Sequence, residues 1–268
     1  MKGSKWSKRI QRAAELEDAY PFAAEVLRFY QRLADFQQKL YSSLESANNG
    51  SPRTVSRPSD EDLQVQFLLP RFPEFLSCME AISPKPLADS ARHLRAEQSR
   101  QWEKLLSSYW AGEIQSSDGD ANSLLAQGFL QPYAEFIADH AEFLNYDGTV
   151  PLCPFCGSKP LLGVLRPEGD GAKRSLICSL CMTEWNYGRL RCAACGEETV
   201  EKLAVYTTEQ FPHVRVEACD GCHSYIKTVD LTKNGLAIPI VDELATLPLN
   251  LWAREHDYVK LQPNLLGI

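Results

Sequence analysis

The stretch that decides the fold runs from residue 153 to residue 222 and contains four Cys-x-x-Cys pairs. These are Cys153-Pro154-Phe155-Cys156, Cys178-Ser179-Leu180-Cys181, Cys192-Ala193-Ala194-Cys195 and Cys219-Asp220-Gly221-Cys222. Two cysteines separated by two residues can direct both sulfurs at one ion, and two such pairs supply the four thiolates of a tetrahedral zinc or single-iron site. The eight cysteines therefore predict two metal ions, with every one of these thiolates as a ligand.

The pairs can combine in more than one way. The outer gaps, 157–177 and 196–218, hold 21 and 23 residues, and these lengths suit a ribbon with four cysteines. Each gap also contains short β-forming runs, so each ribbon could fold locally around its own ion. This favours sequential pairing, in which the first two pairs bind one metal and the last two bind the other. Interleaved pairing, as in cross-braced zinc domains, is the alternative.

The residue after each pair bears on the turn and on the metal. Gly157 and Gly196 follow the first and third pairs, where glycine tolerates the positive φ of a tight turn. Met182 and His223 hold the matching places after the second and fourth pairs, which predicts turns that are less ideal or differently built. Spacing alone favours structural zinc over redox-active iron and over a dithiol oxidoreductase. The run from Cys153 to Gly157, however, looks like a rubredoxin knuckle and favours iron.

Composition excludes some classes of protein. The chain has 268 residues, 44% of them hydrophobic, and a net charge of −7, whereas a nucleic-acid binder usually carries a basic face. No apolar run follows the basic residues near the start, and no stretch reaches the length needed to cross a bilayer. We therefore expect a cytoplasmic protein with no stable membrane insertion. In that reducing compartment, paired cysteines more often bind metal than form disulfides.

The apolar pattern changes near residue 148. Before it, helical spacing predicts helices over 4–18, 21–41, 87–110 and 124–144, the last kinked or divided at Pro132. After it the apolar runs are short and β-rich, and 240–256 is expected to form one C-terminal helix broken near Pro248. These features predict an α+β fold. Its parts are an N-terminal all-α helical bundle (1–147), a tandem rubredoxin-like, or zinc-ribbon-like, four-cysteine metal domain (148–239), and a C-terminal helical segment (240–268) that packs back on the fold.

Residues outside the eight cysteines receive structural interpretations. Cys78 lies at an apolar helix position and is expected to be a buried free thiol. His223 is expected to face solvent or to form a hydrogen bond, and Trp185 to shield one site as a core residue. No phosphate loop, dinucleotide fingerprint or Ser/His/Asp motif is present, so we expect no catalytic residues and no enzymatic turnover.

With these motifs in hand, the chain resembles the formate dehydrogenase accessory protein family, FdhE. The resemblance covers roughly residues 150 to 230, through the four Cys-x-x-Cys pairs and the link between the ribbons, which contains Trp185. It is carried by the stretches 153–160, 175–185, 191–196 and 219–227. The helical first half agrees with the family in type and length only.

The resemblance implies a cytoplasmic assembly factor for a respiratory formate dehydrogenase that is exported by the twin-arginine route. It implies iron in two tetra-cysteine sites, with zinc as a possible substitute. It also implies binding of the client's catalytic subunit or of its twin-arginine signal. Acidic clusters at Asp60-Glu61-Asp62 and at Asp118 and Asp120 could attract such a basic signal. The alternatives are a tandem rubredoxin-type electron carrier and a structural zinc-ribbon interaction module.

Overall fold

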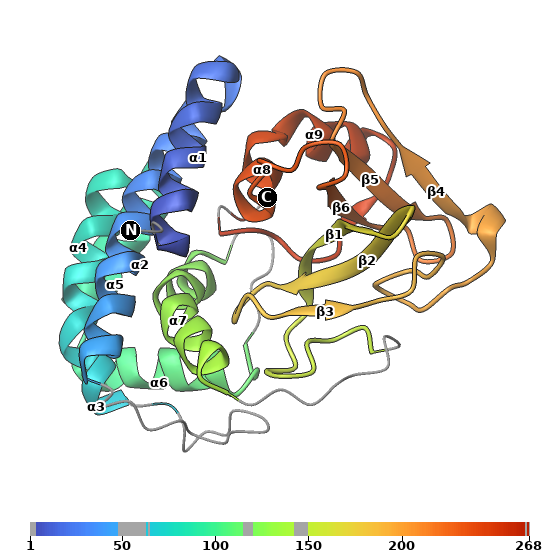
Figure 1. Cartoon of the computed structure of the whole chain (residues 1–268). Helices are drawn as coiled ribbons and strands as arrows, with labels where there is room; N and C mark the ends of the chain where they lie inside the picture. The colour runs from blue at the N-terminus through green and yellow to red at the C-terminus, as the bar shows by residue number, and fades with distance from the viewer. Residues whose placement is uncertain are drawn as a thin grey trace.

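The first half of the chain forms a layer of helices that lies against one side of a mixed β-sheet (Figure 1). The computed structural model describes residues 4–47, 63, 65–114, 120–141, 150–265 and 267. The helical layer contains α1 (Lys5–Ala19), α2 (Ala24–Ala47), α3 (Val65–Leu68), α4 (Phe72–Ile82), α5 (Lys85–Ala96), α6 (Ser99–Trp110) and α7 (Ala121–Asp139), with short 3-10 turns η1 (Pro21–Ala23) and η3 (Leu69–Arg71).

Helix α7 lies between the outer helices and the sheet (Figure 1), and nearly all of its residues are buried. It remains one helix across Pro132, although proline removes a backbone donor and leaves the carbonyl four residues earlier without its partner. That carbonyl belongs to Gly128, and the buried Gln37 of α2 donates its Nε2–H to it at 2.7 Å. Pro132 therefore does not divide the helix, because a side chain from α2 replaces the missing donor.

The single helix expected over 87–110 is wrong. The chain forms α5 and α6 instead, because Glu97 and Gln98 are extended, with ψ of 166° and 153°. The Trp102 indole donates to the carbonyl of Leu94 at 2.7 Å and so satisfies one of the free acceptors at the end of α5. Trp102 also packs edge-on against Phe72. These contacts of Trp102 stabilise the break between α5 and α6, where the sequence has neither glycine nor proline.

The second half forms a seven-stranded sheet whose main path runs in the order β3-β2-β1-β6-β5-β4, with β7 pairing to β6. Neighbours are antiparallel except β1 with β6 and β6 with β7. The strands are β1 (Pro160–Glu168), β2 (Gly171–Cys178), β3 (Glu184–Asn186), β4 (Leu203–Tyr206), β5 (Val214–Cys219), β6 (Ser224–Asp230) and β7 (Val259–Lys260), and the 3-10 turn η4 (Val200–Lys202) precedes β4.

The sheet curves so that strands that are not neighbours meet over one face. Arg174 of β2 and Glu217 of β5 are separated by β1 and β6 in the strand order, yet the Nη2–Oε2 distance is 2.6 Å. Gly163 of β1 permits the close approach of β6, because a Cβ there would lie 2.3 Å from Oγ1 of Thr228. The strands of the two ribbon-like modules therefore belong to one curved sheet.

Helices α8 (Pro239–Ala245) and α9 (Leu247–Glu255) follow the sheet and lie over its β5–β6 side (Figure 1). Under α8, Lys227 of β6 and Glu243 are both fully buried and lie 2.9 Å apart (Nζ–Oε1). Asp242 in the same helix binds Arg12 of α1 at 2.6 Å. The short C-terminal helices thus connect the second ribbon to the helical layer.

The expected α+β fold class is confirmed, with helices first and then a sheet region with two four-cysteine groups. The predicted domain boundaries, at 147/148 and 239/240, stay predictions, and the first lies outside the described residues. Among the helices described, none is both long and apolar enough to cross a membrane.

Candidate metal centres

All four Cys-x-x-Cys pairs end in the same backbone conformation. Gly157 and Gly196 have φ of 76° and 77°, and Met182 and His223 have φ of 58° and 54°. The amide of this fifth residue donates to the carbonyl of the first cysteine at 2.8 Å in the first and fourth pairs and at 3.0 Å in the third. The fourth turn is therefore built like the first and third, whereas the second shares the positive φ but has no such bond recorded among the described residues. Met182 and His223 accept a left-handed conformation that glycine adopts more easily.

The structure groups the sulfurs sequentially. The first group contains Cys153, Cys156, Cys178 and Cys181, the second contains Cys192, Cys195, Cys219 and Cys222, and the ligand atoms in each lie within 4.8 Å of one another. The closest cross-pair sulfur distances are 3.3 and 3.6 Å in the first group and 3.8 and 3.8 Å in the second. Interleaved pairing is not observed.

These dimensions fit a tetrahedral metal ion. With metal–sulfur bonds of about 2.3 Å, the edge of the sulfur tetrahedron is about 3.8 Å. The second group matches that edge, and the first is slightly tighter. Each group offers four sulfurs and so could hold one ion with every position filled by protein, the arrangement of a closed site.

Backbone and side-chain groups surround the sulfurs. The amides of Leu180 and Cys181 point at Sγ of Cys178 at 3.3 and 3.4 Å, and the amide of Ala194 points at Sγ of Cys192 at 3.3 Å. The Ser158 hydroxyl lies 3.3 Å from Sγ of Cys156. Such donors stabilise thiolate charge and tune a bound metal.

The thiols of the two groups differ in acidity. Burial raises the pKa of Cys178 well above its ordinary value of 9.0, and burial raises the pKa of Cys192 to about 12. Contacts with the other sulfurs, led by that of Cys153, lower the pKa of Cys156. In both groups the sulfurs stand for the thiolates that a metal would bind, so metal binding must displace protons from the most buried thiols.

The first group lies against the helical layer. Cys153, Cys178 and Cys181 are at most 3% exposed, and Leu180 belongs to the same apolar core as helices α2, α4 and α7. The carbonyl of Ser179 accepts hydrogen bonds from Gln127 and Gln131 of α7, both at 3.2 Å. The side-chain oxygen of Gln131 in turn accepts a hydrogen bond from Nε2 of Gln37, the same amide that donates to the carbonyl of Gly128. A chain of buried amides thus joins α2, α7 and the second Cys-x-x-Cys turn.

The hollow beside Cys192 and Cys219 of the second group is lined by the sheet, the link before Cys192 and the C-terminal segment. Cys195 is exposed and Cys222 is half-buried. The Tyr187 hydroxyl donates to the carbonyl of Cys192 at 2.9 Å, and the Tyr258 hydroxyl donates to Asp220 at 2.5 Å. The two groups therefore share a ligand set but differ in their access to solvent.

The C-terminal segment passes between the two groups. Strand β7 pairs with the start of β6. After it, Leu261 lines the hollow beside Cys192 and Cys219, and Gln262 lines the hollow beside Cys156 and Ser179. Sequence reasoning missed this role, together with the roles of Tyr187, Gln127 and Gln131. No periodicity could have found them, because each acts on a segment that is distant in the sequence.

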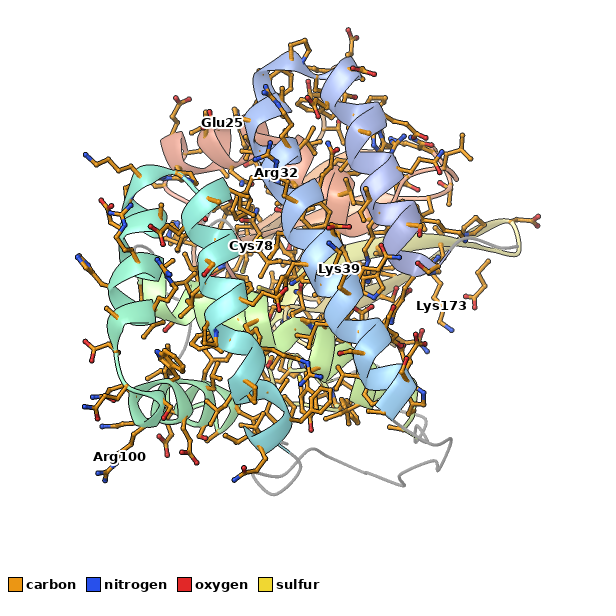
Figure 2. The ribbon with its side chains drawn as sticks, turned by 90° about the vertical axis from the view of Figure 1, so that its left-hand side faces the viewer. Glu25, Arg32, Lys39, Cys78, Arg100 and Lys173 are labelled. Carbon is orange, nitrogen blue, oxygen red and sulfur yellow. The ribbon has the colours of Figure 1, made fainter. Side chains whose placement is uncertain are left out.

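Other residues singled out in the sequence stand apart from both groups. Cys78 lies half-buried on the outer face of the helical layer, near Lys39 and Arg32 of α2 (Figure 2), and burial raises its pKa. Trp185 is 5% exposed and packs in the core with the first group, as expected. His223 is exposed, with its ring 6.2 Å from that of Tyr258. Among the described residues, neither four-cysteine group includes a histidine.

The acidic clusters are covered only in part. Asp60-Glu61-Asp62 and Asp118 lie outside the described residues. Asp120 precedes α7 and accepts a hydrogen bond from Ser123. It therefore has a local role at the start of that helix.

Two family models match the chain. The FdhE central domain matches residues 152–189 and the FdhE C-terminal domain matches residues 190–266. The boundary between the models falls between the two four-cysteine groups, so each model contains one complete group.

Curated relatives and a solved structure agree with these models. A protein FdhE homolog from Aquifex aeolicus is 28% identical over 96% of this chain and 94% of its own length. Another from Pseudomonas aeruginosa is 28% identical over 97% and 89%, and one from Shewanella oneidensis is 40% identical over 43% and 39%. The crystal structure of the FdhE protein from Pseudomonas aeruginosa superimposes with a TM-score of 0.73 at 24% identity, covering 99% of this chain and 97% of that one, which shows a shared fold. Two adjacent family models, two relatives matched over nearly their full length and a shared fold together support assignment of this chain to the FdhE family.

Proposed function

We propose that this protein is an accessory factor for the assembly of a formate dehydrogenase, that it binds two metal ions, and that it catalyses no turnover of its own. The observation that carries the proposal is the closure of all eight paired cysteines into two four-sulfur groups. A catalytic zinc site usually keeps one position for water or substrate, whereas four protein sulfurs fill a structural or electron-transfer site. Family membership supplies the connection to formate dehydrogenase.

The proposed ligands are Cys153, Cys156, Cys178 and Cys181 for one ion and Cys192, Cys195, Cys219 and Cys222 for the other. We propose iron in these sites, at least in part, with zinc as the substitute. An iron ion held by four thiolates could gain or lose one electron, whereas zinc is redox-inert. The chain's own contribution would be to hold the four sulfurs in a tetrahedron and to stabilise their charge with the amides of Leu180, Cys181 and Ala194.

The proposed client is the catalytic subunit of the formate dehydrogenase, met in the cytoplasm before twin-arginine export. The twin-arginine signal of that subunit is a separate candidate for contact. The two differ chemically, because such a signal is basic at its start and apolar after it. They can therefore be tested as separate ligands.

The test measures binding of the purified catalytic subunit and of a synthetic signal peptide to the metal-loaded protein, each at low and high salt. We expect the subunit to bind, and deletion of the accessory protein to lower formate dehydrogenase assembly in cells. If neither ligand binds at any salt and deletion leaves assembly unchanged, the proposal is wrong.

An electron carrier is the second candidate, and the exposure of Cys195 favours it. An exposed ligand would let a redox partner approach the second site closely. Colour and metal content of the protein from iron-replete cells show whether the sites hold iron, which an electron carrier requires. A colourless protein with two equivalents of zinc would exclude the carrier and contradict the iron assignment, but would leave client binding open to its own test.

A further inference from the structure

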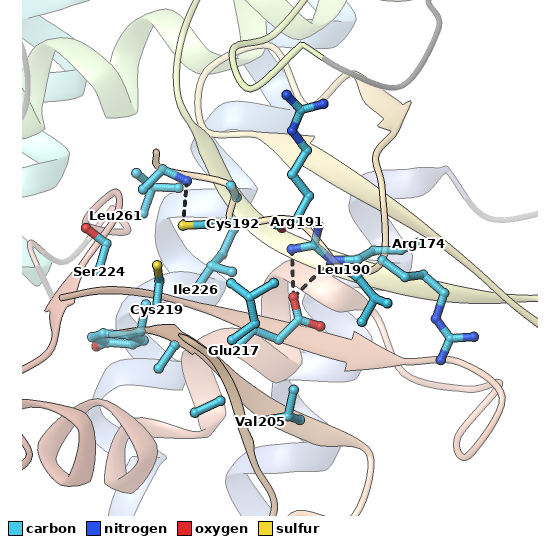
Figure 3. Close-up of a pocket in the computed structure, with 17 residues that line it drawn as sticks. Arg174, Leu190, Arg191, Cys192, Val205, Glu217, Cys219, Ser224, Ile226 and Leu261 are labelled. Atoms are coloured by element: carbon cyan, nitrogen blue, oxygen red, sulfur yellow. Dashed lines mark hydrogen bonds and ion pairs between the residues drawn. The ribbon is translucent and has the colours of Figure 1, made fainter. Parts of the chain in front are cut away.

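A groove lies beside the second four-cysteine group, between strand β4 and the link that leads to Cys192 (Figure 3). We call it the β4 groove and define it by Leu190, Arg191, Leu203, Val205 and Ile226, which line it. Leu190 is 63% exposed and Val205 is 52% exposed. Large apolar side chains that share one hollow in this way are typical of a binding surface.

Strand β4 is the last strand of the main path, and its outer edge is open. The carbonyl of Lys202 accepts a hydrogen bond from the amide of Asp220 at 2.9 Å, and the register pairs Ala204 with Ala218. Hydrogen-bonded and non-hydrogen-bonded pairs alternate in an antiparallel ladder, so the backbone groups of Leu203 and Val205 point away from β5. The amide of Leu203 donates a hydrogen bond to the carbonyl of Val200. Among the described residues, no hydrogen bond is recorded from the amide or carbonyl of Val205 on this open side.

An open strand edge next to an apolar groove is the arrangement that binds an extended peptide. A peptide that adds beside β4 would exchange hydrogen bonds with the backbone of Val205, and its alternate side chains would enter the groove. Folded proteins usually protect such an edge with charges, proline or a covering loop. Here the residue at the centre of the open edge is an exposed valine.

The charge around the groove selects the kind of peptide. Arg174, Arg189 and Arg191 line it, and Glu217 is the one acidic residue among its lining residues. Arg174 forms a close ion pair with Glu217, at 2.6 Å (Nη2–Oε2). Arg191 forms a longer one with the exposed Glu198, at 3.4 Å (Nε–Oε1). Arg189 is exposed and donates to a backbone carbonyl at 3.3 Å. The rim therefore has an excess of positive charge and would attract an acidic side chain. A metal-loaded cysteine group is itself anionic, so that side chain would lie over Arg189 and away from the sulfurs.

We propose that the β4 groove binds an extended, apolar segment with an acidic residue from the catalytic subunit, as an added strand beside β4. This rests on the proposed function, and it names the surface and the peptide chemistry. The arginine rim would repel the basic start of a twin-arginine signal, so the groove discriminates between the two candidate ligands. A second copy of this chain, pairing β4 with β4, is the competing occupant.

The experiment compares the intact metal-loaded protein with four variants. Leu190→Asp places a negative charge in the groove, and Val205→Pro removes the outward backbone donor without removing a bond to β5. Val205→Thr keeps the donor and serves as its control. Leu236→Asp is the control for charge, because Leu236 is 82% exposed and does not line the groove. Each variant must retain its metal content and melting temperature before binding of the catalytic subunit and of the signal peptide is measured.

We expect Leu190→Asp and Val205→Pro to weaken binding of the subunit by about tenfold or more, and both controls to bind within about twofold of the unchanged protein. A photo-crosslinker placed at Leu190 should join an acidic, apolar segment of the subunit. If the subunit binds all variants equally, the groove assignment is wrong and the proposed function stands. If it binds none, including the unchanged protein, the groove assignment is wrong, and the proposed function also fails if the signal peptide does not bind and deletion leaves assembly unchanged. If the unchanged protein is a dimer that Val205→Pro dissociates and the subunit makes no contact with the groove, a second copy occupies β4 and the assignment is also overturned.

Discussion

The two four-cysteine groups have the same ligands and the same local turns, yet they differ in their surroundings. In the first group, Cys153, Cys178 and Cys181 are buried against the helical layer, and two glutamines of α7 bind the turn between its cysteines. In the second, Cys195 is exposed, and the hydroxyls of Tyr187 and Tyr258 bind the carbonyl of Cys192 and the carboxylate of Asp220. The comparison teaches that one group supports the contact between helices and sheet, while the other has a cysteine that solvent can reach.

The two connections to the helical layer also differ in chemistry. The first ribbon is joined to α7 by neutral amides, Gln127 and Gln131 with Ser179. The second is joined to α8 by the buried ion pair of Lys227 and Glu243, and α8 is joined to α1 by Asp242 and Arg12. Neutral amides keep their hydrogen bonds across a wide range of pH, whereas an ion pair depends on the protonation of both partners.

The largest expected effect comes from removing one group at a time. In the variant Cys153→Ser/Cys156→Ser, we expect one metal equivalent to be lost and α7 to lose protection from hydrogen exchange. A structural metal site can contribute on the order of 10 kcal/mol, comparable with the stability of a whole domain. In Cys192→Ser/Cys195→Ser we expect one equivalent to be lost with α7 still protected. Metal analysis and hydrogen exchange check both, and equal loosening of α7 in the two variants would contradict the comparison.

Next in size is the ion pair. Glu243→Gln leaves the ammonium of Lys227 buried without its carboxylate, so we expect the free energy of unfolding to fall by about 3–5 kcal/mol near neutral pH. Chemical denaturation at constant metal loading measures the loss. Glu255→Gln, at an exposed position in α9, is the control and should change little.

The same variant gives a pH test. Burial alone would raise the pKa of Glu243, but the attraction of Lys227 and Lys260 outweighs it and lowers the pKa to about 2 from an ordinary 4.5. Because the folded-state pKa is depressed, the stability that this carboxylate contributes is present above about pH 4.5 and is lost as the pH falls towards 2. The difference in unfolding free energy between the unchanged protein and Glu243→Gln should therefore shrink across that window. A constant difference would show that the carboxylate charge is not responsible.

A smaller effect is expected at the first junction. Gln131→Ala removes one of the two donors to the carbonyl of Ser179 and leaves that of Gln127, so we expect a loss of about 1–3 kcal/mol. In contrast with Glu243→Gln, the loss should not change with pH between 4.5 and 2. Thermal unfolding at several pH values tests this, with Gln101→Ala on the exposed side of α6 as the matched control.

The smallest expected effect is a difference in the rate of metal release, which can be measured without any substitution. A chelator added to the metal-loaded protein should remove the metal in two phases, with the second site emptying about tenfold faster, because solvent access to a metal depends on the shell around it. Stopped-flow measurement with a chromogenic chelator resolves the phases. Only one phase should remain after Cys192→Ser/Cys195→Ser, and persistence of a fast phase in that variant would reverse the assignment.

Much of the candidate site is predictable from the order of residues alone. Four repeats of Cys-x-x-Cys are a local pattern, and the geometry of each turn depends on only five consecutive residues, so the eight cysteines are identifiable as one set. The turn at His223 is not predicted correctly. Its left-handed backbone, with φ of 54°, accompanies a hydrogen bond from its amide to the carbonyl of the first cysteine, Cys219.

The helices are predictable where their apolar periodicity is long. The break between α5 and α6 is not, because it depends on the contact of Trp102 with Leu94 and Phe72. That α7 continues across Pro132 cannot be predicted from the sequence either. Pro132 is tolerated because Gln37, 95 positions earlier in the sequence, lies beside the carbonyl of Gly128.

By itself, the sequence determined the chemistry: which side chains could bind metal, that two ions would suffice, and that helices precede strands. It could do so because spacing and periodicity act within a few residues. Only the tertiary structure decided that the second group has an exposed cysteine, Cys195, and the first has none, that Arg174 meets Glu217 across the curved sheet, and that β4 has an open edge. These features depend on how segments that are distant in the sequence pack together. That packing is driven by burial of apolar surface across the whole molecule, which no local pattern specifies.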